Sequence, residues 1–234
     1  MTTAITTMNN DKLFYLLQLA GGTFPTGGFS QSWGLETYVE EGIITDSVQL
    51  QSFLVTYLHQ VLQDFEGPAY CQAHDLAAAA DETGLRRLEE VLWAMKLTQE
   101  TRDASVRMGK ALLRISSQIL EDPFLHAYYR NAPGGRISYP LAYGLLVARL
   151  QIPKQDGLRA YLFSSVNGVV QSGIKLIPLG ITQAQQLLAW LHPLMEEVAA
   201  AASLPEKAEL ASFFPALDIA SMRHEVLPTR LYMS

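Results

Sequence analysis

Apolar residues at helical spacing are the feature of this sequence that most restricts its fold. Between Thr45 and Glu66 they recur every three or four residues, at Leu50, Phe53, Leu54, Tyr57, Leu58, Val61, Leu62 and Phe65. This spacing places these side chains on one face of an α-helix, because the helix repeats every 3.6 residues. We expect Asp46 or Thr45 to cap this helix and Gly67-Pro68 to end it.

The same periodicity continues along the rest of the chain. The further expected helices cover residues 13–20, 68–81, 84–95, 102–120, 140–150, 156–175 and 182–202. Thr182 and Gln185 have the spacing of a capping box, in which two side chains satisfy free backbone N–H groups. Strand signals are scarce, since the short β-branched runs lie inside or beside helical patterns. The sequence therefore predicts an all-α fold, a single-domain helical bundle of roughly 8–10 helices with a C-terminal tail.

The sequence indicates a single domain, because no feature that would divide the chain occurs between the expected helices. No repeat of fixed period and no low-complexity linker divides it. We expect a flexible N-terminus over residues 1–11, one all-α domain over residues 12–215, and a partner-binding tail over residues 216–234.

Composition narrows the classes of function. Of the 234 residues, 49% are hydrophobic and only 17% are charged, so part of the apolar surface is expected to be covered by a partner. The net charge is −6 and no basic cluster occurs, which argues against a nucleic-acid partner. No signal peptide and no apolar run long enough to span a membrane are visible, so we expect a cytoplasmic protein.

The stretch Gly22-Thr23-Phe24-Pro25-Thr26-Gly27-Gly28-Phe29 has the glycine spacing of a phosphate-binding loop. Such a loop needs a preceding strand, and a lysine and a hydroxyl residue after the second glycine. Here Gly28 and Phe29 follow Gly27, and the preceding residues are helical in pattern. The sequence therefore favours a sharp turn between helices, formed by Pro25, Gly27 and Gly28, with Gly34 a short way beyond.

Motifs for catalysis or metal binding are equally scarce. The five histidines are scattered, no HExxH or GxSxG motif occurs, and the serines have no evident histidine partner. Cys71, the only cysteine, and His74 have the spacing of one helix face, a pattern that is more often packing than ligation. We expect no catalytic residue, no cofactor and no metal ligand in this chain.

The C-terminal tail is unusually rich in apolar and arginine residues for a chain end. Chain ends are ordinarily polar and frayed, whereas this one carries Ile219, Met222, Leu227, Leu231, Tyr232 and Met233 with two arginines. Either it docks onto its own domain, or it is held for a partner and orders on binding. The content of arginine and tyrosine favours an interface slightly.

Three blocks of the sequence together resemble the UreF family of urease accessory proteins. They are FPTGGFSQSWGLETYVEEGII near the N-terminus, SSVNGVVQSGIKLIPLGITQAQQLL in the middle and LDIASMRHEVLPTRLYMS at the end. The resemblance runs from about residue 12 to the C-terminus. It departs from the family pattern at Gly21-Gly22, at Ser138 and at Lys175.

The resemblance implies a non-enzymatic chaperone of nickel-enzyme maturation. Members of the family form homodimers that bind the accessory protein UreH, also named UreD, and the GTPase UreG. This assembly engages apo-urease and delivers nickel to it, and UreF is viewed as a modulator of the GTPase and as part of a nickel route.

The resemblance also implies which residues contact the partners. Tyr38 and Arg230 are the first candidates for the interface with the second accessory protein, followed by Arg223, His224 and Glu225. The same motifs add Glu36, Leu231 and Tyr232. Arginine supplies planar hydrogen bonding, and tyrosine combines apolar area with a polar tip.

Two other classes of function stay open from the residues alone. One is a helical small-molecule enzyme or ligand carrier, with a pocket lined by Trp93, Trp190 and tyrosines. The other is a nickel-storage protein, against which the scattered histidines argue.

Overall fold

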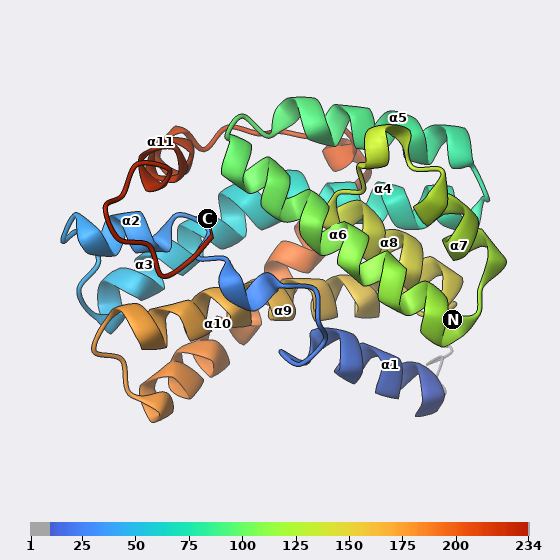
Figure 1. Cartoon of the computed structure of the whole chain (residues 1–234). Coiled ribbons are helices and arrows are strands. Elements are labelled where there is room, and N and C mark those ends of the chain that lie inside the picture. Colours follow the sequence, from blue (N-terminus) through green and yellow to red (C-terminus); the bar gives the residue numbers. More distant parts are fainter. Residues whose placement is uncertain (1–9, 234) are drawn as a thin grey trace.

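The computed structural model describes residues 10–233, and within them every regular element is a helix (Figure 1). The predicted all-α fold is therefore confirmed. The α-helices are α1 (Asn10–Ala20), α2 (Leu35–Glu40), α3 (Ser47–Tyr57), α4 (Gly67–Ala78), α5 (Glu82–Met95), α6 (Gln99–Leu120), α7 (Pro123–Arg130), α8 (Tyr139–Arg149), α9 (Lys154–Leu176), α10 (Ile181–Ala202) and α11 (Pro215–His224). The short helices are η1 (Gly28–Ser30), η3 (Pro133–Gly135), η4 (Pro205–Ala208) and the π-helical η2 (Leu58–Glu66).

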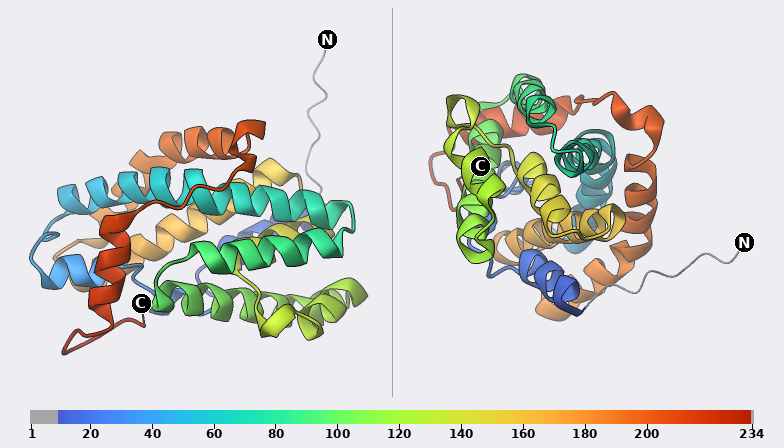
Figure 2. Two further views of the ribbon diagram at one scale, coloured as in Figure 1. Left: turned by 90° about the horizontal axis from the view of Figure 1, so that it is seen from above. Right: turned by 90° about the vertical axis from the view of Figure 1, so that its right-hand side faces the viewer.

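Helix α8 is the centre of the bundle. Every residue from 139 to 147 is buried, and this stretch contains no charged side chain, as expected of a helix surrounded on all sides. Helices α4 and α6 pack most extensively against it. The end-on view in Figure 2 shows α8 enclosed by the other helices.

Close approach of α4 and α8 depends on Gly144. A Cβ atom at this position would lie 2.4 Å from the backbone oxygen of Tyr70 and 3.0 Å from the Cβ atom of Ala73. We expect Gly144→Ala to lower the free energy of unfolding by roughly 1–3 kcal/mol, because one helix must move away. Urea unfolding measures this. The matched control is Gly168→Ala in α9, where the added Cβ meets open space and should stabilise the helix slightly; similar losses for both variants would contradict the prediction.

The expectation that Gly67-Pro68 ends the long helix is wrong. The chain passes from α3 through η2 directly into α4, and Gly67 has helical dihedral angles, φ −64° and ψ −50°. Pro68 lies at the start of α4, where its missing N–H removes few helical hydrogen bonds. A Cβ atom on Gly67 would come within 2.8 Å of Ala202 Cβ, so this glycine permits helix packing instead of ending a helix.

The predicted N-terminal cap is correct for α3 and wrong for α10. Asp46 caps α3 as predicted, accepting hydrogen bonds from the N–H groups of Val48 and Gln49. The capping box at Thr182 is wrong, because α10 begins at Ile181. Its N-cap is Gly180, whose N–H donates to the Gln183 side chain at 3.1 Å.

Besides α11 in the tail, two short α-helices were not expected from the sequence. One is α7, whose first residue is Pro123, just beyond the helix expected over residues 102–120. Asp122 caps α7 by accepting hydrogen bonds from two backbone N–H groups. The other is α2, which follows Gly34. Of the expected flexible N-terminus, residues 1–9 lie outside the described residues, and Asn10 and Asp11 begin α1.

The glycine-rich stretch connects α1 to η1 and α2. Gly27 and Gly34 have φ angles of 85° and 83°, in the left-handed region that favours glycine. Gly34 also faces α11, since a Cβ atom there would lie 3.0 Å from Leu217 Cδ1. This stretch therefore turns the chain and receives the C-terminal tail.

Candidate functional site

The C-terminal tail folds back onto its own domain. Figure 1 shows α11 beside α2, with the following chain returning toward the start of α2. The Thr37 hydroxyl donates to the carbonyl oxygen of Ala220 at 2.9 Å, and Ser221 Oγ donates to Thr98 Oγ1 at 3.2 Å. These buried bonds fix α11 against α2 and the start of α6.

Glu36 is the central anchor of the docked tail. Its carboxylate is buried, and one oxygen accepts the Leu231 N–H at 2.6 Å. The other oxygen accepts the Tyr232 N–H at 3.1 Å and lies 2.8 Å from His224 Nε2. A single carboxylate on α2 therefore binds the chain at two separate points of the tail.

Glu100, in the first turn of α6, is a second anchor. Its Oε2 atom lies 2.7 Å from His224 Nδ1, and its Oε1 atom accepts a hydrogen bond from Arg230 Nη1 at 2.8 Å. His224 is thus completely buried between two carboxylates, each of which also holds another tail residue. We call Glu36, Glu100 and His224 the tail cluster.

The structure brings most of the sequence-predicted site residues together. Glu36, His224, Arg230, Leu231 and Tyr232 meet in or beside the tail cluster. Glu100 was missed, because no local motif marks it and it is 124 residues from His224 in the sequence.

The remaining predicted residues lie around this group. Arg223 forms an ion pair with Glu41 at 2.9 Å, and Glu225 follows α11 on the exposed side. Tyr38 is half-buried and packs edge-on against Phe53 of α3, with ring centroids 5.7 Å apart. Burial, then the charge of Glu41, raises the pKa of the Tyr38 phenol. Tyr38 therefore remains a neutral hydroxyl on the α3 side of α2.

The outer side of the docked tail is apolar with charged neighbours. Ile219, Met222, Val226 and Leu231 are exposed by 49%, 49%, 80% and 65%. Exposed apolar side chains gathered in this way are typical of surfaces that another protein covers. We call the exposed residues Ile219, Met222, Arg223, Glu225, Val226, Arg230 and Leu231 the tail surface.

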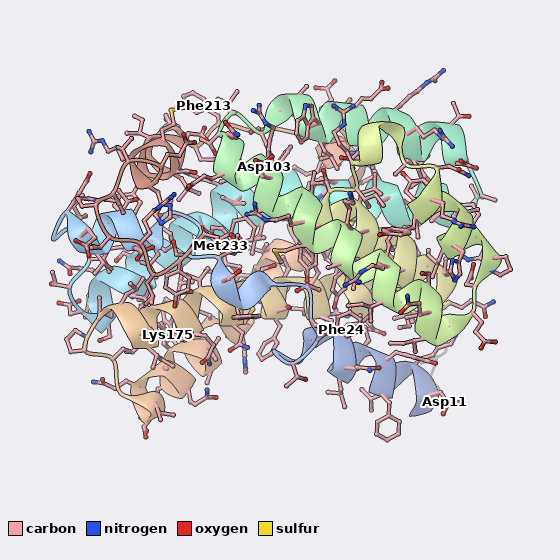
Figure 3. All side chains as sticks on the ribbon, in the orientation of Figure 1. Asp11, Phe24, Asp103, Lys175, Phe213 and Met233 are labelled. Carbon is pink, nitrogen blue, oxygen red and sulfur yellow. The ribbon has the colours of Figure 1, made fainter. Side chains whose placement is uncertain are left out.

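The end of the tail also reaches the glycine-rich stretch. The Met233 N–H donates to the Ser30 carbonyl oxygen at 2.9 Å, and the labelled Met233 lies beside this stretch in Figure 3. The ring of Tyr232 is buried and lies 5.7 Å from Lys175 Nζ of α9. The tail therefore contacts Lys175 and the residue directly after the glycine-rich stretch, and both regions also line a cavity.

That cavity has a volume of about 430 Å³. Aromatic side chains from the glycine-rich stretch and its flank form one wall, namely Phe24, Phe29 and Trp33. Polar side chains of α9 form another, namely Ser164, Ser165, Asn167, Gln171 and Lys175, while Tyr57, Glu66 and Tyr139 line it as well.

A buried ion pair lies next to this cavity. Glu66, the last residue of η2, accepts hydrogen bonds from Lys96 Nζ at 2.6 Å and from the Tyr161 hydroxyl at 2.7 Å. Burial, then the nearby charge of Glu66, raises the pKa of the Tyr161 phenol well above its ordinary value. Tyr161 is therefore a neutral donor that, with Lys96, satisfies both oxygens of this carboxylate.

The aromatic pocket expected around Trp93 and Trp190 does not form. Trp190 is about half exposed on α10, and Trp93 lies between the guanidinium groups of Arg102 and Arg136. The cavity of about 430 Å³ is lined by Trp33, Tyr57 and Tyr139 instead.

Across residues 10–233, no group of three or more histidine, cysteine or acidic side chains is arranged to hold a metal ion. Cys71 is buried in α4, and burial raises the pKa of its thiol to about 11. Its neighbour His74 is directed toward the Ile152 carbonyl oxygen, 3.4 Å from Nε2. Among the helices that the structure describes, none is long and apolar enough to cross a membrane.

The fold and the site define an all-α protein whose C-terminal tail is anchored by buried charges and presents an apolar surface. Comparison with known proteins gives the particular family. The family model UreF matches residues 44–192. The chain belongs to the UreF family of urease accessory proteins.

Individual relatives extend this similarity over nearly the whole chain. The urease accessory protein UreF of Bacillus sp. (strain TB-90) is 34% identical, over 96% of this chain and 100% of the relative. The protein of that name from Geobacillus kaustophilus is 33% identical, over 97% and 100%. A third, from Nostoc sp., is 35% identical, over 98% and 99%.

Proposed function

We propose that this chain is a non-catalytic urease maturation factor that acts by assembling other proteins. The observation that carries this proposal is the near full-length similarity to proteins named urease accessory protein UreF. The tail surface supports it, because it offers exposed apolar side chains flanked by arginines. Its partners are UreH/UreD, the GTPase UreG and apo-urease, and the chain works in the cytoplasm as a homodimer.

In this proposal the tail surface meets the second accessory protein. Arg230, Arg223 and Leu231 are exposed there and provide hydrogen-bond donors and apolar area. Glu225 belongs to the same surface, and Tyr38 lies on the α3 side of α2. Glu36, His224 and Tyr232 are buried, so they contribute by holding the exposed residues in place.

The assembly delivers nickel into apo-urease and modulates the GTPase. Any nucleotide is bound by the GTPase, since the glycine-rich stretch of this chain lacks the lysine of a phosphate-binding loop. Nickel is cargo of the assembled complex in this scheme.

Co-expression with UreH/UreD and UreG, followed by size-exclusion chromatography, tests the proposal. We expect the chain to elute with both partners in one peak, and the purified chain alone to hydrolyse no nucleotide. Elution of the chain separate from both partners, with and without GTP, would contradict the proposed function.

Arg230→Ala tests the proposed contact at the tail surface. Arg230 is exposed and its ion pair with Glu100 is partly solvated, so removing it should change the free energy of unfolding by less than about 1 kcal/mol. Affinity for UreH/UreD should fall about tenfold or more, because arginines often carry a large share of interface energy. Isothermal titration calorimetry and thermal unfolding measure the two effects.

The matched control is Arg159→Ala, which removes an exposed arginine paired with Glu196 and Asp156 away from the tail. It should leave partner affinity unchanged. If Arg230→Ala lowers the melting temperature strongly and leaves partner affinity intact, the arginine is structural and the contact is elsewhere.

The cavity favours a second function, that of a small-molecule carrier. Its volume of about 430 Å³ is within the range of ligand pockets, and it combines aromatic walls with polar groups. Native mass spectrometry of the protein purified without denaturant tests this function. A stoichiometric bound molecule that is lost in a Ser165→Trp variant, which fills the cavity, would favour the carrier.

A further inference from the structure

The tail cluster contains a hydrogen-bonding arrangement that requires an extra proton. His224 directs Nε2 to Glu36 at 2.8 Å and Nδ1 to Glu100 at 2.7 Å. A neutral imidazole has one N–H, and an ionised carboxylate only accepts hydrogen bonds. With a neutral ring, one of the two contacts would place a nitrogen lone pair against a carboxylate oxygen.

The other contacts of the two carboxylates indicate where this proton is held. The Glu36 oxygens already accept the N–H groups of Leu231 and Tyr232, and Glu100 accepts Arg230. A proton on either carboxyl group would weaken these bonds. If both carboxylates are ionised and His224 is an imidazolium, every hydrogen-bond donor within the tail cluster or directed at it has an acceptor. The negative charges of Glu36 and Glu100 are then balanced by the positive charges of His224 and Arg230.

The charged groups around His224 come from each element that packs on α11. Glu36 faces it from α2 and Glu100 from α6, while Arg230 reaches Glu100 from the end of the tail. Directly after α2, Glu41 forms an ion pair with Arg223. Among these neighbours, the two carboxylates that contact the ring therefore stabilise its cationic form.

We propose that the tail cluster is a protonation-dependent latch, in which the imidazolium of His224 joins the C-terminal tail to α2 and α6. The tail docks when His224 is protonated and is released when the ring loses its proton. Given the proposed function, which this step rests on, the latch controls whether the tail surface is formed for the partner.

The direction of the pH effect follows from the proton count. A histidine free in solution is mostly neutral above about pH 6.5, so the ring of a released tail carries no extra proton there. Docking then takes up one proton, and raising the pH opposes it. The ratio of docked to released tail should therefore fall as the pH rises above about 6.5.

Nuclear magnetic resonance of the full chain tests the latch directly. In the docked state we expect both ring nitrogens of His224 to carry hydrogen. The amide signals of Leu231 and Tyr232 should move from docked to released positions as the pH rises from about 6.5 to about 9. A docked tail with only one ring N–H, or amide signals that stay unchanged over this range, would overturn the proposal.

Glu100→Gln separates the latch from ordinary tail packing. Its amide oxygen can still accept from Arg230, while its NH₂ group can donate to a neutral ring at Nδ1. We expect this variant to keep the tail docked at high pH, so the pH dependence is largely lost. Unchanged dependence in Glu100→Gln would overturn the proposal.

Two controls accompany this measurement. His126→Gln removes an exposed histidine of α7 and should titrate like the unmodified chain. Circular dichroism confirms that the helix content of each variant is retained.

Complex formation with UreH/UreD at the two ends of the pH range then tests the regulatory step. Affinity should fall with pH for the unmodified chain and stay level for Glu100→Gln. If no complex forms at any pH, the proposed function fails while the resonance result for the latch stands. If affinity is the same at both pH values although the tail is released, the latch does not control the partner.

Discussion

Lys96→Met should destabilise the fold by about 3–5 kcal/mol, because it leaves the Glu66 carboxylate buried without its cation. Both side chains are almost fully buried, so bulk solvent screens the unpaired carboxylate poorly. Only the Tyr161 hydroxyl would still donate to Glu66. Urea unfolding followed by circular dichroism measures the loss.

Two further variants make this result specific. Lys207→Met removes the cation of a partly exposed pair with Asp64 and should cost no more than about 1 kcal/mol. Adding Glu66→Gln to Lys96→Met removes the unpaired charge and should recover a large part of the stability. A loss below about 1 kcal/mol for Lys96→Met would show that Glu66 is neutral or solvated in the folded protein.

Glu36→Ala should release the tail from the rest of the protein. The change removes the acceptor for the Leu231 and Tyr232 N–H groups and one of the two carboxylates that bind His224. Loss of a buried charged partner costs about 3–5 kcal/mol, which corresponds to a shift of about two to four orders of magnitude in the docking equilibrium. Amide hydrogen exchange should show residues 224–233 losing protection.

The matched control for this prediction is Glu40→Ala, which removes an exposed carboxylate from the same helix. It should leave exchange in the tail unchanged. The helices of the central bundle should keep their protection in both variants, since the tail cluster lies outside the contacts between α4 and α8. Full protection of residues 224–233 in Glu36→Ala would show that α11 packing alone holds the tail.

The positions of the helices could be predicted because their signals are local. Apolar spacing and the caps reach across only a few residues, so the ranges of α6, α8 and α9 follow closely from the sequence. The error at Gly67-Pro68 arose because a glycine can serve packing as well as termination. That distinction depends on Ala202, which is far away in the sequence.

The pairing of charges could not be predicted in the same way. His224 is 188 residues from Glu36 and 124 from Glu100, and no motif links the three. The tail motif identified His224, Arg230 and Tyr232 as notable residues, whereas the burial of His224 and Tyr232 depends on how α11 and the following chain pack against α2. Tyr232 illustrates the limit, since a residue expected at an interface lies beneath the surface.

The position of Lys175 links the tail to the cavity. Its ammonium group lies over the Tyr232 ring, and the same residue lines the cavity wall. A molecule bound in the cavity that moved Lys175 away from the Tyr232 ring would change the affinity of the tail for the surface on which it docks. By thermodynamic reciprocity, tail docking would change the affinity for that molecule by the same factor. The hydrogen bond from Met233 to Ser30 adds a second contact between the tail and the chain beside the cavity, so docking of the tail and occupancy of the cavity would be coupled.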